Sequence, residues 1–238
     1  MNVHSVSPRV FLRWIMIAAI TFTAINACAE YHEAAPTPLP PAKTGIHLSP
    51  QSTQESIVLA GGCFWGVQGV FQHVKGVKTA VSGYAGGTQE NAHYHAVSSG
   101  LTGHAEAVEV RFDASQISLG EILQIYFSVA HDPTQLNHQG PDDGTQYRSA
   151  IFYKNDNQKS IAESYINQLN QGHYFSKPIV TQLNPLKAFY PAETDHQDYA
   201  TLHPDNRYIA YYDLPKINNL RKLFQNLYTE QPALVFPR

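Results

Sequence analysis

The stretch Ser56-Ile57-Val58-Leu59-Ala60-Gly61-Gly62-Cys63-Phe64-Trp65-Gly66 decides the fold. Its apolar run, 57–60, ends in two glycines, which predicts a buried strand followed by a sharp turn. Apolar residues then recur at helical spacing, at Phe64, Val67, Phe71 and Val74. Gly76 ends this predicted helix. Cys63 therefore lies where a buried strand passes into a helix.

The following sequence alternates between strand and helix patterns. Further strands are predicted over 77–83, 104–112 and 150–153. Ser118 and Glu121 form a capping box that opens a second helix. A helix around 161–169, a strand near 179–180 and C-terminal helical segments follow. The sequence predicts an α/β (α+β) protein, a two-layer sandwich with a ferredoxin-like split βαβ core and a C-terminal extension.

The beginning of the 238-residue chain predicts export. Arg9 and Arg13 precede an apolar run over 14–25, which is too short to span a bilayer and suits a signal peptide. Ala27-Cys28-Ala29 predicts cleavage that removes residues 1–29, whereas the same segment also fits a degenerate lipoprotein signal with a lipid anchor on Cys28. We therefore expect a periplasmic protein or a membrane-anchored lipoprotein.

Prolines dominate the next segment, residues 30–54, which we interpret as a linker before a single catalytic domain over 55–230. The formal net charge is -3 and charged residues make up 15% of the chain. Such a composition offers no basic face for nucleic acid.

The cysteine count points to a reactive thiol. The chain has two cysteines, and either processing route removes or blocks Cys28, so Cys63 is left as a single free thiol. An unpaired cysteine in an oxidising compartment indicates reactivity, and a turn flanked by glycines is a poor position for a merely buried cysteine. The N–H groups of the following helix are expected to lower its pKa.

Glu106 is the candidate acid. In the predicted strand it shares one face with Val108, Val110 and Phe112, whereas the other face carries Ala107 and Glu109. A carboxyl group on the buried face is expected to have a raised pKa and to serve as a general acid.

Aromatic and polar residues complete the candidate site. Phe64 and Trp65 directly follow the thiol and can form an apolar pocket for a small alkyl group. Two polar loops supply Tyr94, Asp142 and Tyr147, whose hydroxyl and carboxyl groups can act on an oxygen atom held near the sulfur.

Several separate motifs resemble those of the A-type peptide methionine sulfoxide reductases. They keep the family's order over roughly residues 56 to 215: Gly62-Cys63-Phe64-Trp65-Gly66, Gly83-Tyr84-Ala85-Gly86-Gly87, Gly103-His104-Ala105-Glu106, His131-Asp132-Pro133, Gly144-Thr145-Gln146-Tyr147-Arg148-Ser149, Phe189-Tyr190-Pro191-Ala192-Glu193 and His196-Gln197-Asp198-Tyr199. Together they are far more specific than any one motif.

The resemblance implies reduction of the S epimer of methionine sulfoxide, free or in oxidised proteins, by a monomer that needs no cofactor. It assigns Cys63 as the nucleophile and Glu106 as the acid. It places Tyr94, Asp142 and Tyr147 around the sulfoxide oxygen, and Gly62, Phe64 and Trp65 around the rest of the substrate.

The chain departs from many family members because no cysteine follows Cys63. The usual internal disulfide cannot form, so the resemblance implies an external thiol reductant, such as a thioredoxin-like protein or dithiothreitol.

Two other functions fit parts of the sequence. A cysteine hydrolase would need a histidine poised to take the thiol proton and an oxyanion hole. A metal-binding lipoprotein would use Cys63 with His93, His95 and His104, although their spacing matches no recognised ligand pattern.

Overall fold

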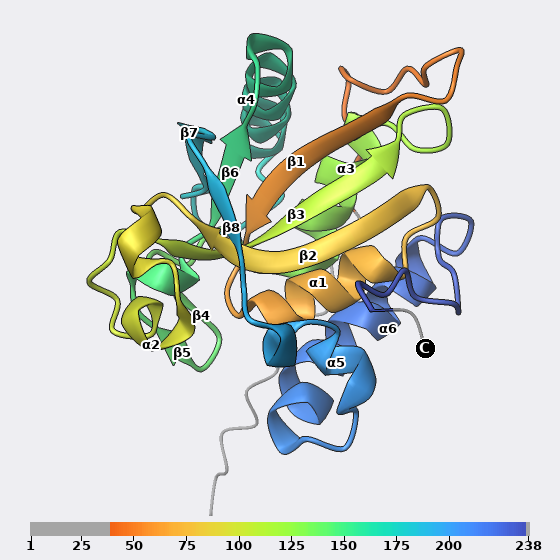
Figure 1. Cartoon of the computed structure of the whole chain (residues 1–238). Helices are drawn as coiled ribbons and strands as arrows, with labels where there is room; N and C mark the ends of the chain where they lie inside the picture. The colour runs from red at the N-terminus through yellow and green to blue at the C-terminus, as the bar shows by residue number, and fades with distance from the viewer. Residues whose placement is uncertain (1–38, 237–238) are drawn as a thin grey trace, which may run out of the picture. The chain divides into compact units, whose positions relative to one another are not determined.

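A computed structural model describes residues 39–236, and the predicted signal peptide lies outside these described residues. Its centre is a six-stranded sheet with the order β7-β6-β1-β3-β2-β8 (Figure 1). The strands are β1 (Gln54–Ala60), β2 (Val77–Ala85), β3 (Ala105–Asp113), β6 (Ala150–Tyr153), β7 (Gln182–Pro185) and β8 (Phe189–Pro191). Neighbouring strands are antiparallel except for β6 and β7, which are parallel. The predicted α/β class is confirmed, with β7 and β8 extending the sheet at its edges.

Three helices lie against one face of this sheet. They are α1 (Phe64–Gln72), α3 (Leu119–Ile125) and α4 (Asp156–Gln171). Their apolar side chains form one buried cluster with the inward residues of the strands, including Ile57, Val108 and Ile151. Burial of this apolar surface is the main force that holds the two layers together.

The C-terminal segment packs on the outer side of α1. It contains α5 (Tyr199–Leu202), a π-helical turn η5 (Ile209–Asp213) and α6 (Leu214–Leu223), and it lies beside α1 in Figure 1. Leu220 is fully buried there and Ile217 nearly so. This segment therefore belongs to the same hydrophobic core as the sheet.

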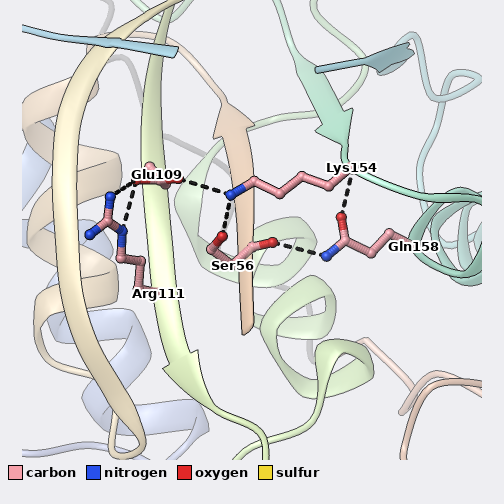
Figure 2. Close-up of polar contacts among 5 residues, drawn as sticks. All are labelled: Ser56, Glu109, Arg111, Lys154 and Gln158. Carbon is pink, nitrogen blue, oxygen red and sulfur yellow. Dashed lines mark hydrogen bonds and ion pairs between the residues drawn. The ribbon is translucent and has the colours of Figure 1, made fainter. Parts of the chain in front are cut away.

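The opposite face of the sheet carries a smaller apolar cluster and a charged network. Figure 2 shows Glu109 of β3 between Arg111 and Lys154. Its two carboxylate oxygens lie 2.7 Å from Nη2 of Arg111 and 3.0 Å from Nζ of Lys154. Lys154 also contacts the hydroxyl of Ser56, while Gln158 donates to the Ser56 carbonyl at 2.9 Å. Burial raises the pKa of the Glu109 carboxyl group, but its pairing with Lys154 and Arg111 outweighs burial and lowers the pKa overall.

Shorter elements lie in the predicted loops. The loop after β2 contains η1 (Gln89–Asn91) and α2 (Tyr94–Val97). The second loop contains the hairpin of β4 (His138–Gln139) and β5 (Asp142–Asp143), followed by η3 (Thr145–Tyr147). The strand predicted near 179–180 is wrong in position, because pairing with β6 begins only at Gln182.

The described part of the proline-rich segment lies against the domain. The Tyr165 hydroxyl donates to the Pro40 carbonyl at 2.8 Å, and Gln124 donates to the Leu39 carbonyl at 2.8 Å. Leu39 and Ala42 are buried. Within residues 39–236, the structure contains no helix long and apolar enough to cross a membrane.

The capping box at α3 is confirmed and generates a stability prediction. Ser118 accepts the Glu121 N–H at 3.3 Å, and Glu121 accepts the Ser118 N–H at 2.9 Å. We expect Ser118→Ala to lower the free energy of unfolding by about 1 kcal/mol, because a buried helix start loses its cap. Urea denaturation measures this, with Ser160→Ala on the exposed face of α4 as the matched control. An equal effect in both variants would contradict the capping role.

Candidate active site

Cys63 is the N-cap residue of α1, directly after the glycine turn at the end of β1. Gly62 has φ +88°, a conformation that favours glycine, and an added Cβ would lie 2.5 Å from Cγ of Gln139. The Gln139 side chain is itself fixed by two hydrogen bonds to the backbone of Asp132, both 3.0 Å long. The turn therefore presents the thiol on a rigid support, and the Cys63 side chain is nearly buried.

Glu106 lies beside the first turn of the same helix. Its carboxylate accepts the backbone N–H of Phe64 at 3.1 Å, and only 2% of the residue is exposed. Burial raises the pKa of Glu106 to about 8, although the Phe64 N–H acts in the opposite direction. The prediction that Glu106 shares the buried face of β3 is confirmed, and its protonated form is available near neutral pH.

The expected lowering of the Cys63 pKa is wrong for the enzyme without substrate. Burial raises the pKa of the thiol well above its usual value, and the charges of Glu106 and Asp213 raise it further. The backbone N–H of Trp65 lowers it by a smaller amount. The start of α1 does favour the thiolate as expected, but desolvation and two nearby carboxyl groups outweigh it.

Three further predicted residues share this electrostatic environment. Burial raises the pKa of Tyr147, and the nearby charges of Glu106 and Asp142 add to this shift. The pKa of Tyr94 is also raised by burial, then by Glu106 and Cys63. Asp142 lies on the β4–β5 hairpin, and burial raises the pKa of its carboxyl group. The fold thus brings residues from both polar loops to the N-terminal end of α1, beside Cys63.

Several aromatic rings pack around Trp65. The indole stacks on Tyr199, with ring centroids 4.0 Å apart, and on His196 at 5.8 Å. The ring of Tyr208 meets it edge-on at 6.1 Å. Phe64 is fully buried and lies 5.6 Å from His196. The two aromatic residues therefore have different surroundings, with Phe64 in the core and Trp65 among the rings of the C-terminal segment.

Several residues of this site were missed by the sequence analysis. Glu193 accepts the Tyr94 N–H at 2.9 Å and the Tyr84 hydroxyl at 2.8 Å, so it holds α2 against β2. Tyr208 donates a short hydrogen bond to Asp142. Glu193 lies in one of the family motifs, but its position there predicts no particular contact. Nothing in the sequence near Tyr208 indicates that this residue reaches a loop 66 residues away.

A buried ion pair supports the helix that carries the thiol. Asp213 and Lys216 are 0% and 6% exposed, and their charged atoms are 3.2 Å apart. A Cβ at Gly66 would lie 2.1 Å from the Asp213 carboxylate, so only glycine allows this approach to α1. The charge of Lys216 helps to lower the pKa of Asp142 against the larger effect of burial.

Comparison with known proteins shows the family of this chain. The sequence profile described as peptide methionine sulfoxide reductase matches residues 55–228. The chain belongs to this family.

Relatives and solved structures agree with this assignment. Peptide methionine sulfoxide reductase MsrA 2 of Mesorhizobium japonicum is 60% identical over 181 residues, covering 76% of this chain and 93% of the relative. The MsrA of Pasteurella multocida is 48% identical, covering 74% and 99%. The reduced form of Mxr1 from Saccharomyces cerevisiae has a TM-score of 0.59 at 32% identity, covering 71% and 95%. Methionine sulfoxide reductase A of Corynebacterium diphtheriae gives 0.55 at 35% identity, covering 71% and 84%.

The protein is therefore a peptide-methionine (S)-S-oxide reductase, an oxidoreductase that reduces methionine sulfoxide and repairs oxidised proteins. Membership of the reductase family replaces the hydrolase alternative. The described residues also contain no group of three or more metal-ligating side chains. The His104 ring instead interacts with the backbone of Gly87 and Thr88, at 3.2 and 2.9 Å.

The pairing of Glu106 with Cys63 predicts a measurable change in the thiol titration. Glu106→Gln removes a negative charge that raises the Cys63 pKa, so the thiol should ionise at lower pH in the variant. Thiolate absorbance at 240 nm against pH measures this, with Cys63→Ser as the blank. A midpoint that stays unchanged or moves upward would show that the two groups do not interact.

Proposed function

We propose that Cys63 is the nucleophile and Glu106 the general acid of methionine sulfoxide reduction. The observation that carries this proposal is a largely protonated carboxyl group, with a pKa of about 8, held at the first turn of the helix that begins at the thiol. A thiolate can attack the electrophilic sulfur of the sulfoxide, while the oxygen gains negative charge and needs a proton.

The reductive step balances as a two-electron transfer. The Cys63 sulfur loses two electrons and the sulfoxide sulfur gains them, while the sulfur–oxygen bond of the substrate breaks. Glu106 supplies the proton to the oxygen, which ends as the hydroxyl group of a sulfenic acid on Cys63. Methionine is the released product.

The substrate's two ends have different partners in this proposal. Tyr94 and Tyr147 donate hydrogen bonds to the sulfoxide oxygen, and Asp142 orients the polar side of the site. Trp65 contacts the S-methyl group with the fully buried Phe64 packed beside it, and the backbone conformation of Gly62 fixes the turn that presents Cys63. Their placement around the end of α1 supports these roles.

The acid role predicts a large loss of rate. We expect Glu106→Gln to slow the reductive step by about 10²–10⁴, the usual contribution of a positioned general acid. Single-turnover methionine release measures it, with Glu163→Gln on the exposed side of α4 as the control and Cys63→Ser as the inactive reference. A Glu106→Gln rate within a factor of two of wild type would remove Glu106 from the mechanism.

Recycling is proposed to depend on a thiol from outside the chain. No cysteine follows Cys63, so no C-terminal residue can resolve the sulfenic acid. An external thiol attacks the electrophilic sulfur and expels water, and a second thiol then frees Cys63 from the mixed disulfide. A thioredoxin-like dithiol or a small thiol such as dithiothreitol supplies both electrons.

This cycle predicts the yield without reductant. Enzyme mixed with excess methionine sulfoxide should form about one methionine per chain and stop, because the sulfenic acid persists. Dimedone should then label Cys63, as peptide mass spectrometry can verify. Two methionines per chain, or a disulfide between Cys63 and Cys28 in natively processed protein, would contradict the proposal.

We also propose that the enzyme is exported and works as a monomer in the periplasm, or on a membrane through a lipid on Cys28. The basic and apolar pattern of residues 9–25 supports export. The mature chain should begin at Cys28 or Glu30. Intact-mass measurement of protein from native membrane and soluble fractions tests this, and an intact Met1 would overturn it.

A further inference from the structure

A row of tyrosines leads from the active site to the protein surface. Tyr208 touches Trp65 and hydrogen-bonds to Asp142. Its ring lies 5.1 Å from that of Tyr212, which in turn meets Tyr211 edge-on at 4.7 Å. Tyr211 is 53% exposed, among the more exposed large apolar side chains of the described residues.

The position of the row beside the proposed substrate site indicates a binding role. Tyrosine rings offer a large apolar contact area with a hydroxyl at one end, and apolar surface that adjoins a ligand site commonly binds part of the ligand. The other end of the row is Trp65, which the proposed function places against the substrate. The row is therefore continuous with the proposed position of the methionine sulfoxide side chain.

We infer that the Tyr208–Tyr212–Tyr211 row binds the polypeptide that carries the oxidised methionine, through an apolar residue flanking it. This inference rests on the proposed placement of the substrate against Trp65. A peptide substrate has to leave the pocket as an extended chain, and a neighbouring side chain then lies within a few ångströms of the bound residue.

The chemistry of the row selects the kind of flanking residue. Tyrosine ring faces bind aliphatic and aromatic side chains, and they also attract cations. Arg207 is exposed and directly precedes Tyr208, so its positive charge opposes a lysine or arginine at this place. The row therefore favours apolar neighbours over glycine and over basic residues.

The test separates binding of the flank from chemistry at the sulfur. Initial rates are measured for N-acetyl-methionine-sulfoxide methylamide and for pentapeptides with methionine sulfoxide between leucines, glycines or lysines. We expect the leucine peptide to have the lowest KM. Tyr211→Ala should raise the KM of the leucine peptide about fivefold to tenfold, with kcat unchanged, because only uniform binding is lost.

Matched variants make the result specific. Tyr211→Phe keeps the ring and should retain the wild-type KM. Leu48→Ala is the control, because Leu48 is 49% exposed and adjoins Ser49, which contacts Ala114 at the end of the sheet remote from Cys63. The Tyr211→Ala variant should reduce the blocked amino acid, N-acetyl-methionine-sulfoxide methylamide, and the glycine peptide with the same kcat and KM as wild type.

Two results would overturn the inference. One is a ratio of leucine-peptide to glycine-peptide KM that Tyr211→Ala leaves unchanged within a factor of two. The other is a change confined to the KM of a bacterial thioredoxin used as reductant, which would make the row a docking surface for the reductant. Failure of the proposed catalytic site would instead appear as full activity of Cys63→Ser on the blocked amino acid.

Discussion

The hydrogen bond from the Phe64 N–H to the Glu106 carboxyl group connects the sheet to the helix that carries the nucleophile. Neither partner can move far. Phe64 is fully buried, and Glu106 pairs with Tyr84 of β2 next to the end of the antiparallel β2–β3 ladder. An ionised carboxylate at this depth would cost several kcal/mol, and the raised pKa shows how the fold avoids that cost at neutral pH, by keeping the proton on the group. Burial therefore keeps on Glu106 the proton that the proposed mechanism requires.

The C-terminal segment completes the site from the other side of α1. It brings Tyr208 to Asp142 and the Asp213–Lys216 pair to Gly66. Removing one partner of a buried ion pair leaves an uncompensated charge, so this pair strongly restricts which sequences can occupy the segment. In this chain the segment contributes aromatic rings and a buried ion pair around the thiol, rather than a resolving cysteine.

The sequence predicted well what depends on local pattern. The helix after Cys63, the capping box at Ser118 and the buried face of Glu106 all follow from spacing alone, and all are present. The β7 strand was misplaced because Gln182–Pro185 has no apolar alternation, and its pairing with β6 comes from tertiary contacts. Tyr208 and Glu193 were missed for the same reason. Their hydrogen-bond partners lie 66 and about 100 residues away in the sequence and come close only in the folded chain. The prediction for the thiol pKa was wrong because the sequence shows only the position of Cys63 at a helix start, which lowers the pKa. The burial that raises it by a larger amount depends on the whole folded site.

Burial raises the pKa of both Cys63 and Glu106, and the charge of Glu106 raises that of Cys63 further. A negative charge on Glu106 therefore disfavours the Cys63 thiolate, so the proposed mechanism needs the carboxyl group to keep its proton while the thiol ionises. Loss of one proton leaves either a thiolate beside a carboxylic acid or a thiol beside a carboxylate, and only the first form can both attack sulfur and protonate oxygen. A sulfoxide bound with its oxygen toward Glu106 accepts a hydrogen bond from the acid form and therefore favours that distribution. In the proposed mechanism the bound substrate thus favours the Cys63 thiolate, and without substrate the thiol stays largely protonated and less reactive toward oxidants.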